Sequence, residues 1–154
     1  MTGIAILAVA VVAALVFGFY RQRTDGRFKR ESPVAVDRNA GLGRPHEAIR
    51  EWAAISAAVP GAELGERATF VQFSSAFCAP CRTTRTLLAD IAEREEGVVH
   101  LEIDAEQHLD LVRALDVRRT PTTLVLDADG LELTRAAGAP RRDQVLSVLP
   151  EAAR

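Results

Sequence analysis

Two cysteines, Cys78 and Cys81, are the only cysteines in the chain, and two residues, Ala79 and Pro80, separate them. At the start of a helix, thiols at this spacing lie one turn apart on the same face, close enough to form a disulfide. Unpaired backbone N–H groups and the helix dipole stabilise a thiolate at this position. The pattern therefore predicts a redox-active pair, with Cys78 as the exposed nucleophile and Cys81 as the second thiol.

The segments on either side of this pair have the periodicities needed to position it. Residues 68–73 (ATFVQF) are strand-like, and residues 81–95 carry apolar side chains on one helical face, including Leu88 and Ile91. Pro80 suits a first helical turn because its missing N–H has no partner there. A thiol pair in a loop between a strand and a helix is more specific than a CxxC spacing alone.

The rest of the chain alternates between helical and strand-like segments. The order predicts an α/β fold with a mixed sheet and helices on both faces. The predicted elements are a helix opened by Pro45 and ended by Pro60-Gly61, a strand at 98–104, a helix at 109–115, a strand at 122–126, a hairpin turn at Asp129-Gly130, a strand at 131–137 and a helix at 140–149 with Pro140 in its first turn.

From about Ala68 to Leu149 the chain resembles the thioredoxin family. The resemblance implies a thioredoxin-like mixed central sheet flanked by helices, over slightly more than half of the chain. Four features carry it, in this order: a strand leading into Phe77-Cys78-Ala79-Pro80-Cys81, the strand end Leu101-Glu102-Ile103-Asp104, the segment Arg119-Thr120-Pro121-Thr122 before a strand, and Gly138 after the hairpin.

The resemblance also implies roles for the residues around the two thiols. Pro121 would be the cis-proline that packs against the disulfide, and Thr120 would offer its backbone N–H and C=O groups to an extended substrate strand. Phe77, Ala79 and Pro80 would complete the surface that binds the substrate. The implied substrates are protein disulfides, and no cofactor or metal is required.

Several positions depart from the family pattern. Phe77 stands where tryptophan is usual, and Ala79 where glycine is usual. Gln72 stands where a buried aspartate is frequent, and His100 takes the position of a nearby lysine. Glutamine exchanges no proton at pH 7, so water or another group must deprotonate Cys81. We interpret His100 as a structural histidine.

The direction of the redox reaction depends on which form of the pair is more stable. Ala79 and Pro80 bring no charge between the cysteines, which favours a reductase, although Arg82 next to Cys81 can stabilise a thiolate. The alternative is a thioredoxin-fold binding or scaffold module without turnover.

Other kinds of site are not indicated by the sequence. The spacings of the histidines do not fit a zinc site, and the Asp127–Gly130 segment is typical of a turn rather than a calcium loop. Nothing in the sequence indicates nucleic-acid binding.

The beginning of the chain predicts a membrane anchor. Residues 3–20 are uncharged and mostly apolar, and as a helix they would extend about 27 Å, close to the thickness of a bilayer core. Phe17, Phe19 and Tyr20 occupy one end of the run, where interfacial aromatic residues are common. A cleaved signal peptide is the alternative, but no basic residue precedes Gly3 and the run ends without a small-residue cleavage site.

The formal net charge of −2 is distributed unevenly along the 154 residues. Residues 21–30 carry +4, whereas residues 31–154 carry −6. The positive-inside rule then predicts a cytoplasmic domain supplied with electrons by a thioredoxin-reductase-like donor. An extracytoplasmic domain, supplied by a transmembrane donor, is the alternative. We expect three regions: a transmembrane helix (1–20), a basic juxtamembrane linker (21–44) and a thioredoxin-like domain (45–154).

Overall fold

The structure is a computed structural model that describes residues 2–24, 26–29 and 45–151. Ten helices and strands lie within these ranges. In chain order they are α1 (Thr2–Thr24), β1 (Phe28–Lys29), α2 (Pro45–Ala58), β2 (Ala68–Ser74), α3 (Ala79–Arg94), β3 (Val98–Asp104), α4 (Leu109–Ala114), β4 (Thr122–Asp127), β5 (Glu132–Ala137) and α5 (Arg142–Leu146).

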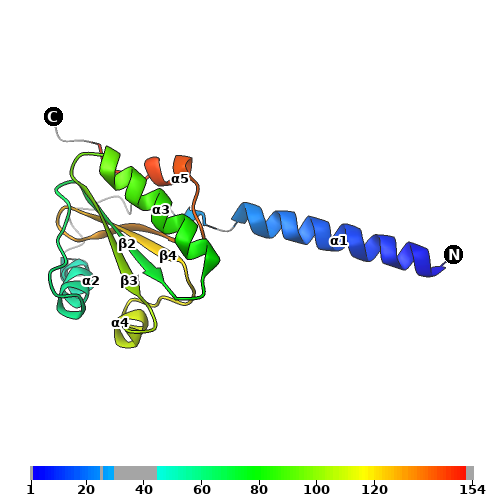
Figure 1. Ribbon diagram of the computed structural model, residues 1–154, viewed down its shortest axis with the longest axis horizontal. Helices are drawn as coiled ribbons and strands as arrows, with labels where there is room; N and C mark the ends of the chain where they lie inside the picture. Colours follow the sequence, from blue (N-terminus) through cyan, green and yellow to red (C-terminus); the bar gives the residue numbers. More distant parts are fainter. Residues whose placement is uncertain (1, 25, 30–44, 152–154) are drawn as a thin grey trace, which may run out of the picture.

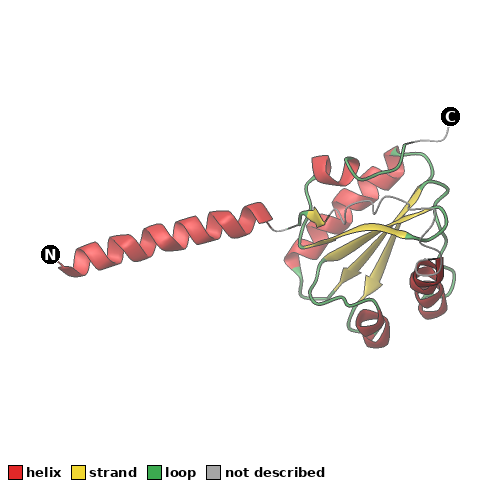
Figure 2. Ribbon diagram, turned by 180° about the vertical axis from the view of Figure 1, so that it is seen from behind, coloured by secondary structure: helices red, strands yellow, loops and turns green. Residues whose placement is uncertain are grey.

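The strands form one mixed sheet in the order β1-β5-β4-β2-β3. Only β2 and β3 pair in parallel, and the other neighbours are antiparallel. Helices α3 and α5 cover one face, and α2 and α4 cover the other (Figures 1 and 2). The predicted α/β class, with a mixed sheet between helices, is therefore confirmed.

Strand β2 runs through the middle of the sheet, and each of its residues is buried. Its side chains alternate between the two cores. Phe70 packs with residues of α3 and α5, whereas Val71 and Phe73 pack with residues of α2 and α4. Burial on both faces explains the nearly continuous apolar run, and it leaves Gln72 as a polar side chain inside the core.

Two predicted boundaries need correction. The last helix does not extend over residues 140–149, because α5 comprises only Arg142–Leu146. Arg141 precedes it with extended backbone (φ −91°, ψ 157°), and its N–H donates to the side chain of Gln144 at 2.9 Å. Pro140 is therefore outside the helix rather than in its first turn. Helix α3 begins at Ala79, two residues earlier than expected.

The predicted juxtamembrane linker contains an unexpected strand. Phe28 pairs with Ala136 and Lys29 with Arg135, so β1 adds an edge to the sheet. Two residues are too few for a visible alternation, and tertiary pairing rather than local pattern forms this strand. Residues 26–29 thus belong to the folded domain, and residues 21–24 of the predicted linker are the last residues of α1. Residues 25 and 30–44 of the predicted linker lie outside the described residues.

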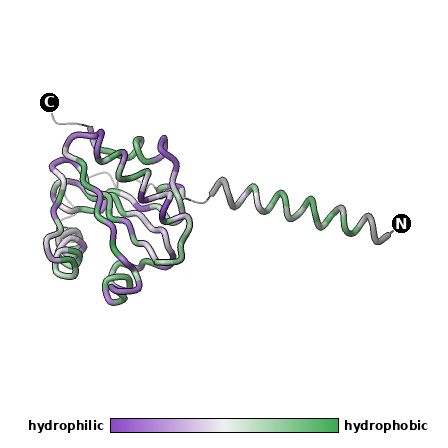
Figure 3. Tube along the Cα trace, in the orientation of Figure 1, coloured by the Kyte–Doolittle hydropathy of each residue, from purple (hydrophilic) through white to green (hydrophobic). Residues whose placement is uncertain are grey.

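Helix α1 projects away from the sheet (Figure 1), and hydrophobic residues recur along it (Figure 3). Its large apolar side chains are exposed where they are described, from Ile6 to Tyr20. In the part of the chain that the structure describes, no helix combines the length and the hydropathy that crossing a membrane requires. The membrane anchor predicted for residues 3–20 is not shown and stays a prediction.

Candidate active site

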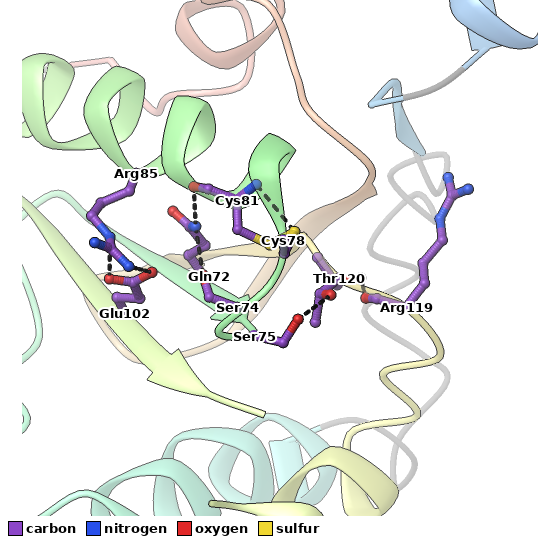
Figure 4. The surroundings of a disulfide bond; sticks show 10 residues. Gln72, Ser74, Ser75, Cys78, Cys81, Arg85, Glu102, Arg119 and Thr120 are labelled. Carbon is purple, nitrogen blue, oxygen red and sulfur yellow. Dashed lines mark hydrogen bonds and ion pairs between the residues drawn. A yellow bond between two sulfur atoms is a disulfide. The ribbon is translucent and has the colours of Figure 1, made fainter. Parts of the chain in front are cut away.

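Cys78 and Cys81 form a disulfide at the junction between β2 and α3 (Figure 4). Their Cα atoms are 5.2 Å apart. Cys78 is the N-cap residue of α3, and its Sγ atom accepts a hydrogen bond from the N–H of Cys81 at 3.1 Å. Sulfur at a helix N-terminus, with a backbone donor aimed at it, is in a position that favours the thiolate after reduction.

The two sulfur-bearing residues differ in their exposure. Cys81 is buried, with 1% of its surface exposed, whereas Cys78 is only half-buried. Around Cys78, Ala79 and Pro80 are exposed, and the side chain of Phe77 is almost completely exposed (98%). An incoming disulfide therefore reaches Cys78 and not Cys81.

A second loop comes to the disulfide from the beginning of β4. The peptide bond between Thr120 and Pro121 is cis, as expected from the sequence. The Oγ1 atom of Thr120 lies 3.2 Å from Oγ of Ser75, and the carbonyl of Ser75 accepts from the N–H of Cys78 at 3.3 Å. The structure thus places Thr120 beside the disulfide, in contact with Ser75 (Figure 4).

Gln72 occupies the buried space beneath the first turn of α3. Its Nε2 atom donates to the carbonyl of Cys81 at 3.0 Å and to Oγ of Ser74 at 2.7 Å. Its Oε1 atom lies 3.2 Å from Nε2 of His100. An amide oxygen only accepts, so Nε2 of His100 carries the hydrogen in this contact. The amide therefore joins Cys81 to His100 without offering a group that titrates.

Burial lowers the pKa of His100 below its usual value. The carboxylate of Glu102 partly offsets this effect, and the guanidinium of Arg85 adds to it. Arg85 and Glu102 pair with each other through two contacts, of 2.5 and 2.7 Å. His100 is consequently neutral at pH 7, which agrees with its interpretation as a structural histidine.

This depressed pKa predicts a pH-dependent stability. Because the unfolded chain binds a proton near the usual histidine pKa of about 6.5 and the folded chain binds it only at lower pH, the free energy of unfolding should fall as the pH drops below about 6.5. We expect His100→Gln to lose less stability between pH 7.5 and pH 5 than the unchanged protein. Urea unfolding of both proteins at both pH values measures the difference, and equal losses would contradict the prediction.

Sequence reasoning missed several groups around the disulfide. Ser74 and Ser75 contact the cysteine loop and its neighbours, and Arg85 pairs with Glu102 across the gap between α3 and β3. A serine after a strand carries no distinctive signal, and the ion pair depends on the register of β3 beside β2. The sequence shows that residue 72 is glutamine, but the partners of its two donated hydrogen bonds could be identified only from the fold.

Comparisons with known proteins agree with this geometry. The family model described as a thioredoxin-like domain matches residues 58–153, which is more than half of the chain. Thioredoxin H-type 1 from Nicotiana tabacum is 31% identical over 83 residues, and these cover 54% of this chain and 65% of the relative. Human thioredoxin domain-containing protein 2 is 40% identical over 60 residues, 39% of this chain and 11% of that protein.

Solved structures show the same fold. A mutant thioredoxin from Halobacterium salinarum aligns with a TM-score of 0.52 at 21% identity, over 58% of this chain and 80% of that one. A thioredoxin from Nicotiana alata aligns at 0.50 and 21% identity, over 64% and 81% of the two chains. The chain spans less than two thirds of the length of these two relatives.

Proposed function

Because this chain belongs to the thioredoxin-like domain family, we propose that it is a membrane-tethered thiol–disulfide oxidoreductase that reduces protein disulfides. One observation carries the proposal. A half-buried Cys78, at the N-terminus of α3, is disulfide-bonded to a buried Cys81. This arrangement separates an attacking sulfur from a resolving sulfur, which is what the transfer of two electrons to a disulfide requires.

The reaction begins with both cysteines reduced. The Cys78 thiolate attacks one sulfur of the substrate disulfide, the substrate S–S bond breaks, and the departing thiolate takes a proton from Cys81 or from water. The Cys81 thiolate then attacks Sγ of Cys78 in the mixed disulfide and releases the second substrate thiolate. The substrate has gained two electrons, and the enzyme is left with the Cys78–Cys81 disulfide. An electron donor must reduce it again.

Cys81 has to lose its proton before the second step. Gln72, which contacts the carbonyl of Cys81, can take no proton at pH 7. The departing substrate thiolate, or water that enters with the substrate, is then the acceptor. The hydrogen bonds from Gln72 instead hold the first turn of α3, so that Sγ of Cys81 stays aligned with Cys78.

The substrate segment would lie across the exposed surface next to Cys78. The exposed residues Phe77, Ala79 and Pro80 would offer apolar contacts, and the loop of Thr120 and Pro121, which contacts Ser75, would border the same surface. Backbone groups of Thr120 would pair with an extended substrate segment as an added strand does. Such pairing is independent of the substrate sequence and suits an enzyme that acts on several protein disulfides.

Reduction of insulin tests the activity. The chain is first reduced, freed of the reductant, and mixed with insulin while free thiols on both proteins are counted. We expect the two thiols of Cys78 and Cys81 to be lost as two appear on insulin. The same chain alkylated with iodoacetamide is the control. If the unmodified chain transfers no electrons, the oxidoreductase proposal is wrong and a binding or scaffold module remains.

The tether is a separate part of the proposal. Helix α1 has 23 residues, about 35 Å in length, and its large apolar side chains between Ile6 and Tyr20 are exposed where they are described. By the positive-inside rule, the basic residues 21–30 favour the cytoplasmic side for the domain, where a thioredoxin-reductase-like protein would donate electrons. The alternative is the extracytoplasmic side and a transmembrane donor.

Two measurements test the tether and its direction. The full chain should float with phospholipid vesicles in a density gradient, whereas residues 26–154 alone should not. A topology reporter fused after Arg154 should be active in the cytoplasm. A full chain that stays at the bottom of the gradient contradicts the anchor, and activity of the reporter on the outer side contradicts only the orientation.

A further inference from the structure

The polypeptide enters the sheet at the disulfide edge, the edge formed by the strand ends that lie nearest the disulfide. Strand β2 ends there at Ser74, β4 begins there, and β5 ends there at Ala137, because β4 is antiparallel to both. Strand β1 is antiparallel to β5, so its first residue, Phe28, also lies at this edge. We call residues 26–29 the N-terminal strap. Three strand spacings separate it from β2, about 15 Å.

The strap is fitted to the domain by a glycine. The N–H of Gly26 donates to the carbonyl of Ala137 at 3.0 Å, and Gly26 has φ +72°. A Cβ atom at this position would lie 2.1 Å from the carbonyl oxygen of Ala139 and 2.8 Å from the nitrogen of Pro140. Backbone atoms cannot move aside as a flexible side chain does, so only glycine fits. Docking of the strap on the domain therefore depends on glycine at position 26.

The strap contacts the same backbone that supports the cis-proline loop. Nη2 of Arg119 also donates to the carbonyl of Ala137, at 2.5 Å. The next residue, Gly138, donates its N–H to the carbonyl of Pro121 at 2.7 Å. Figure 4 shows Arg119 and Thr120 on the side of the disulfide that faces the segment following α1. The strap and the cis-proline loop are thus joined through the backbone of Ala137 and Gly138, to which both are hydrogen-bonded.

The docked strap fixes how far the disulfide lies from α1. Helix α1 ends at Thr24, two residues before Gly26, so their Cα atoms are at most about 7.6 Å apart. The end of β2, from which the cysteine loop departs, then lies within about 25 Å of the end of α1. A free linker over residues 21–44, as the sequence predicts, would let the domain move out to about 80 Å.

We propose that the strap holds the disulfide at the membrane surface, so that the preferred substrates are protein disulfides presented close to the bilayer. The inference rests on the proposed reductase activity and tether. It assigns Gly26 a positioning role: this residue touches no substrate, but it keeps the substrate-facing edge of the sheet beside the end of α1.

The test uses the full chain in phospholipid vesicles and one disulfide peptide whose fluorescence rises on reduction. The peptide is coupled to lipid through a short linker, coupled through a long polymer, or left free in solution. We expect the unchanged protein to reduce the short-linked peptide at least about fivefold faster than the long-linked one, because the effective concentration near the surface is higher. Free peptide should show the basal rate.

Gly26→Ala should undock the strap and lower this preference to about twofold or less, with the rate on free peptide unchanged. Gly61→Ala is the matched control, because Gly61 also has positive φ (+85°) but nothing within 4 Å of an added Cβ. A second variant inserts twelve Gly and Ser residues after Thr24, which frees the docked strap from α1 even if Gly26→Ala folds poorly. It should lose the preference to the same extent.

The rates of the variants decide between the possible explanations. Loss of the preference for the short-linked peptide in the insertion variant, with Gly61→Ala unaffected, supports the inference. An unchanged preference in the insertion variant, with normal reduction of free peptide, overturns it while leaving the reductase activity in place. Absence of reduction of free peptide by the unchanged protein overturns the proposed activity, and failure to float with vesicles overturns the tether; the inference falls with either.

Discussion

Cys78→Ser is expected to lower the rate of insulin reduction at least about a thousandfold, to the background of the reductant alone. A serine hydroxyl is not ionised at neutral pH and forms no bond with a substrate sulfur that resembles a mixed disulfide. Cys81 cannot substitute for the lost nucleophile, because only 1% of its surface is exposed. The measurement is the initial rate of insulin reduction driven by a thiol donor.

The variant should remain folded, which makes a loss of rate interpretable. Cys78 is the N-cap of α3, and serine is among the preferred residues at that position because its hydroxyl oxygen accepts from the backbone N–H groups. The variant lacks the disulfide, whose removal costs up to about 2 kcal/mol for so small a loop in the chain-entropy model. Unfolding is therefore compared under reducing conditions, where neither protein has the bond. A folded variant with more than a tenth of the original rate would contradict Cys78 as nucleophile.

The centre of the candidate site was predictable because its determinants are local. A strand-like run, a loop with Cys78 and Cys81, and an amphipathic helix follow one another within about thirty residues. The cap at Cys78 then follows from helix geometry, since the residue before the first turn meets unpaired N–H groups. The cis bond before Pro121 was expected from the family resemblance and is present in the structure.

Features that depend on the pairing of distant segments were not predictable. Gln72 and His100 lie on neighbouring strands, and only the parallel register of β2 and β3 brings their side chains within 3.2 Å. The N-terminal strap is formed by pairing with β5, more than a hundred residues later. A two-residue strand has no periodicity of its own, so the basic and glycine residues around it read as a linker.

The shortened last helix has a similar cause. Apolar residues at Val145, Val148 and Leu149 continue the helical spacing, but the helix ends at Leu146. All three still pack in the core cluster formed with α3. Burial of these side chains therefore preserved the periodic pattern beyond the end of the helix, which is why the pattern located the core correctly and the boundary incorrectly.

Cys81→Ser should separate the two steps of the reaction. Cys78 keeps its exposure and its place at the N-terminus of α3, and the N–H of residue 81 can still donate to Sγ of Cys78, as it does at 3.1 Å. The first attack on a substrate disulfide therefore proceeds. The second attack lacks a thiolate, so the mixed disulfide between Cys78 and the substrate persists.

We expect Cys81→Ser to reduce insulin at least about a hundredfold more slowly in multiple turnovers while accumulating close to one equivalent of covalent adduct. Non-reducing electrophoresis and mass spectrometry of the intact adduct measure it, and a thiol reductant should release it. The double variant, with serine at both positions, is the matched control and should form none. Adduct on Cys81 in the Cys78→Ser variant, or none on Cys78 in the Cys81→Ser variant, would contradict the assigned order of attack. Of the two thiols in the chain, Cys81 is buried, so an intact folded domain presents Cys78 to a substrate.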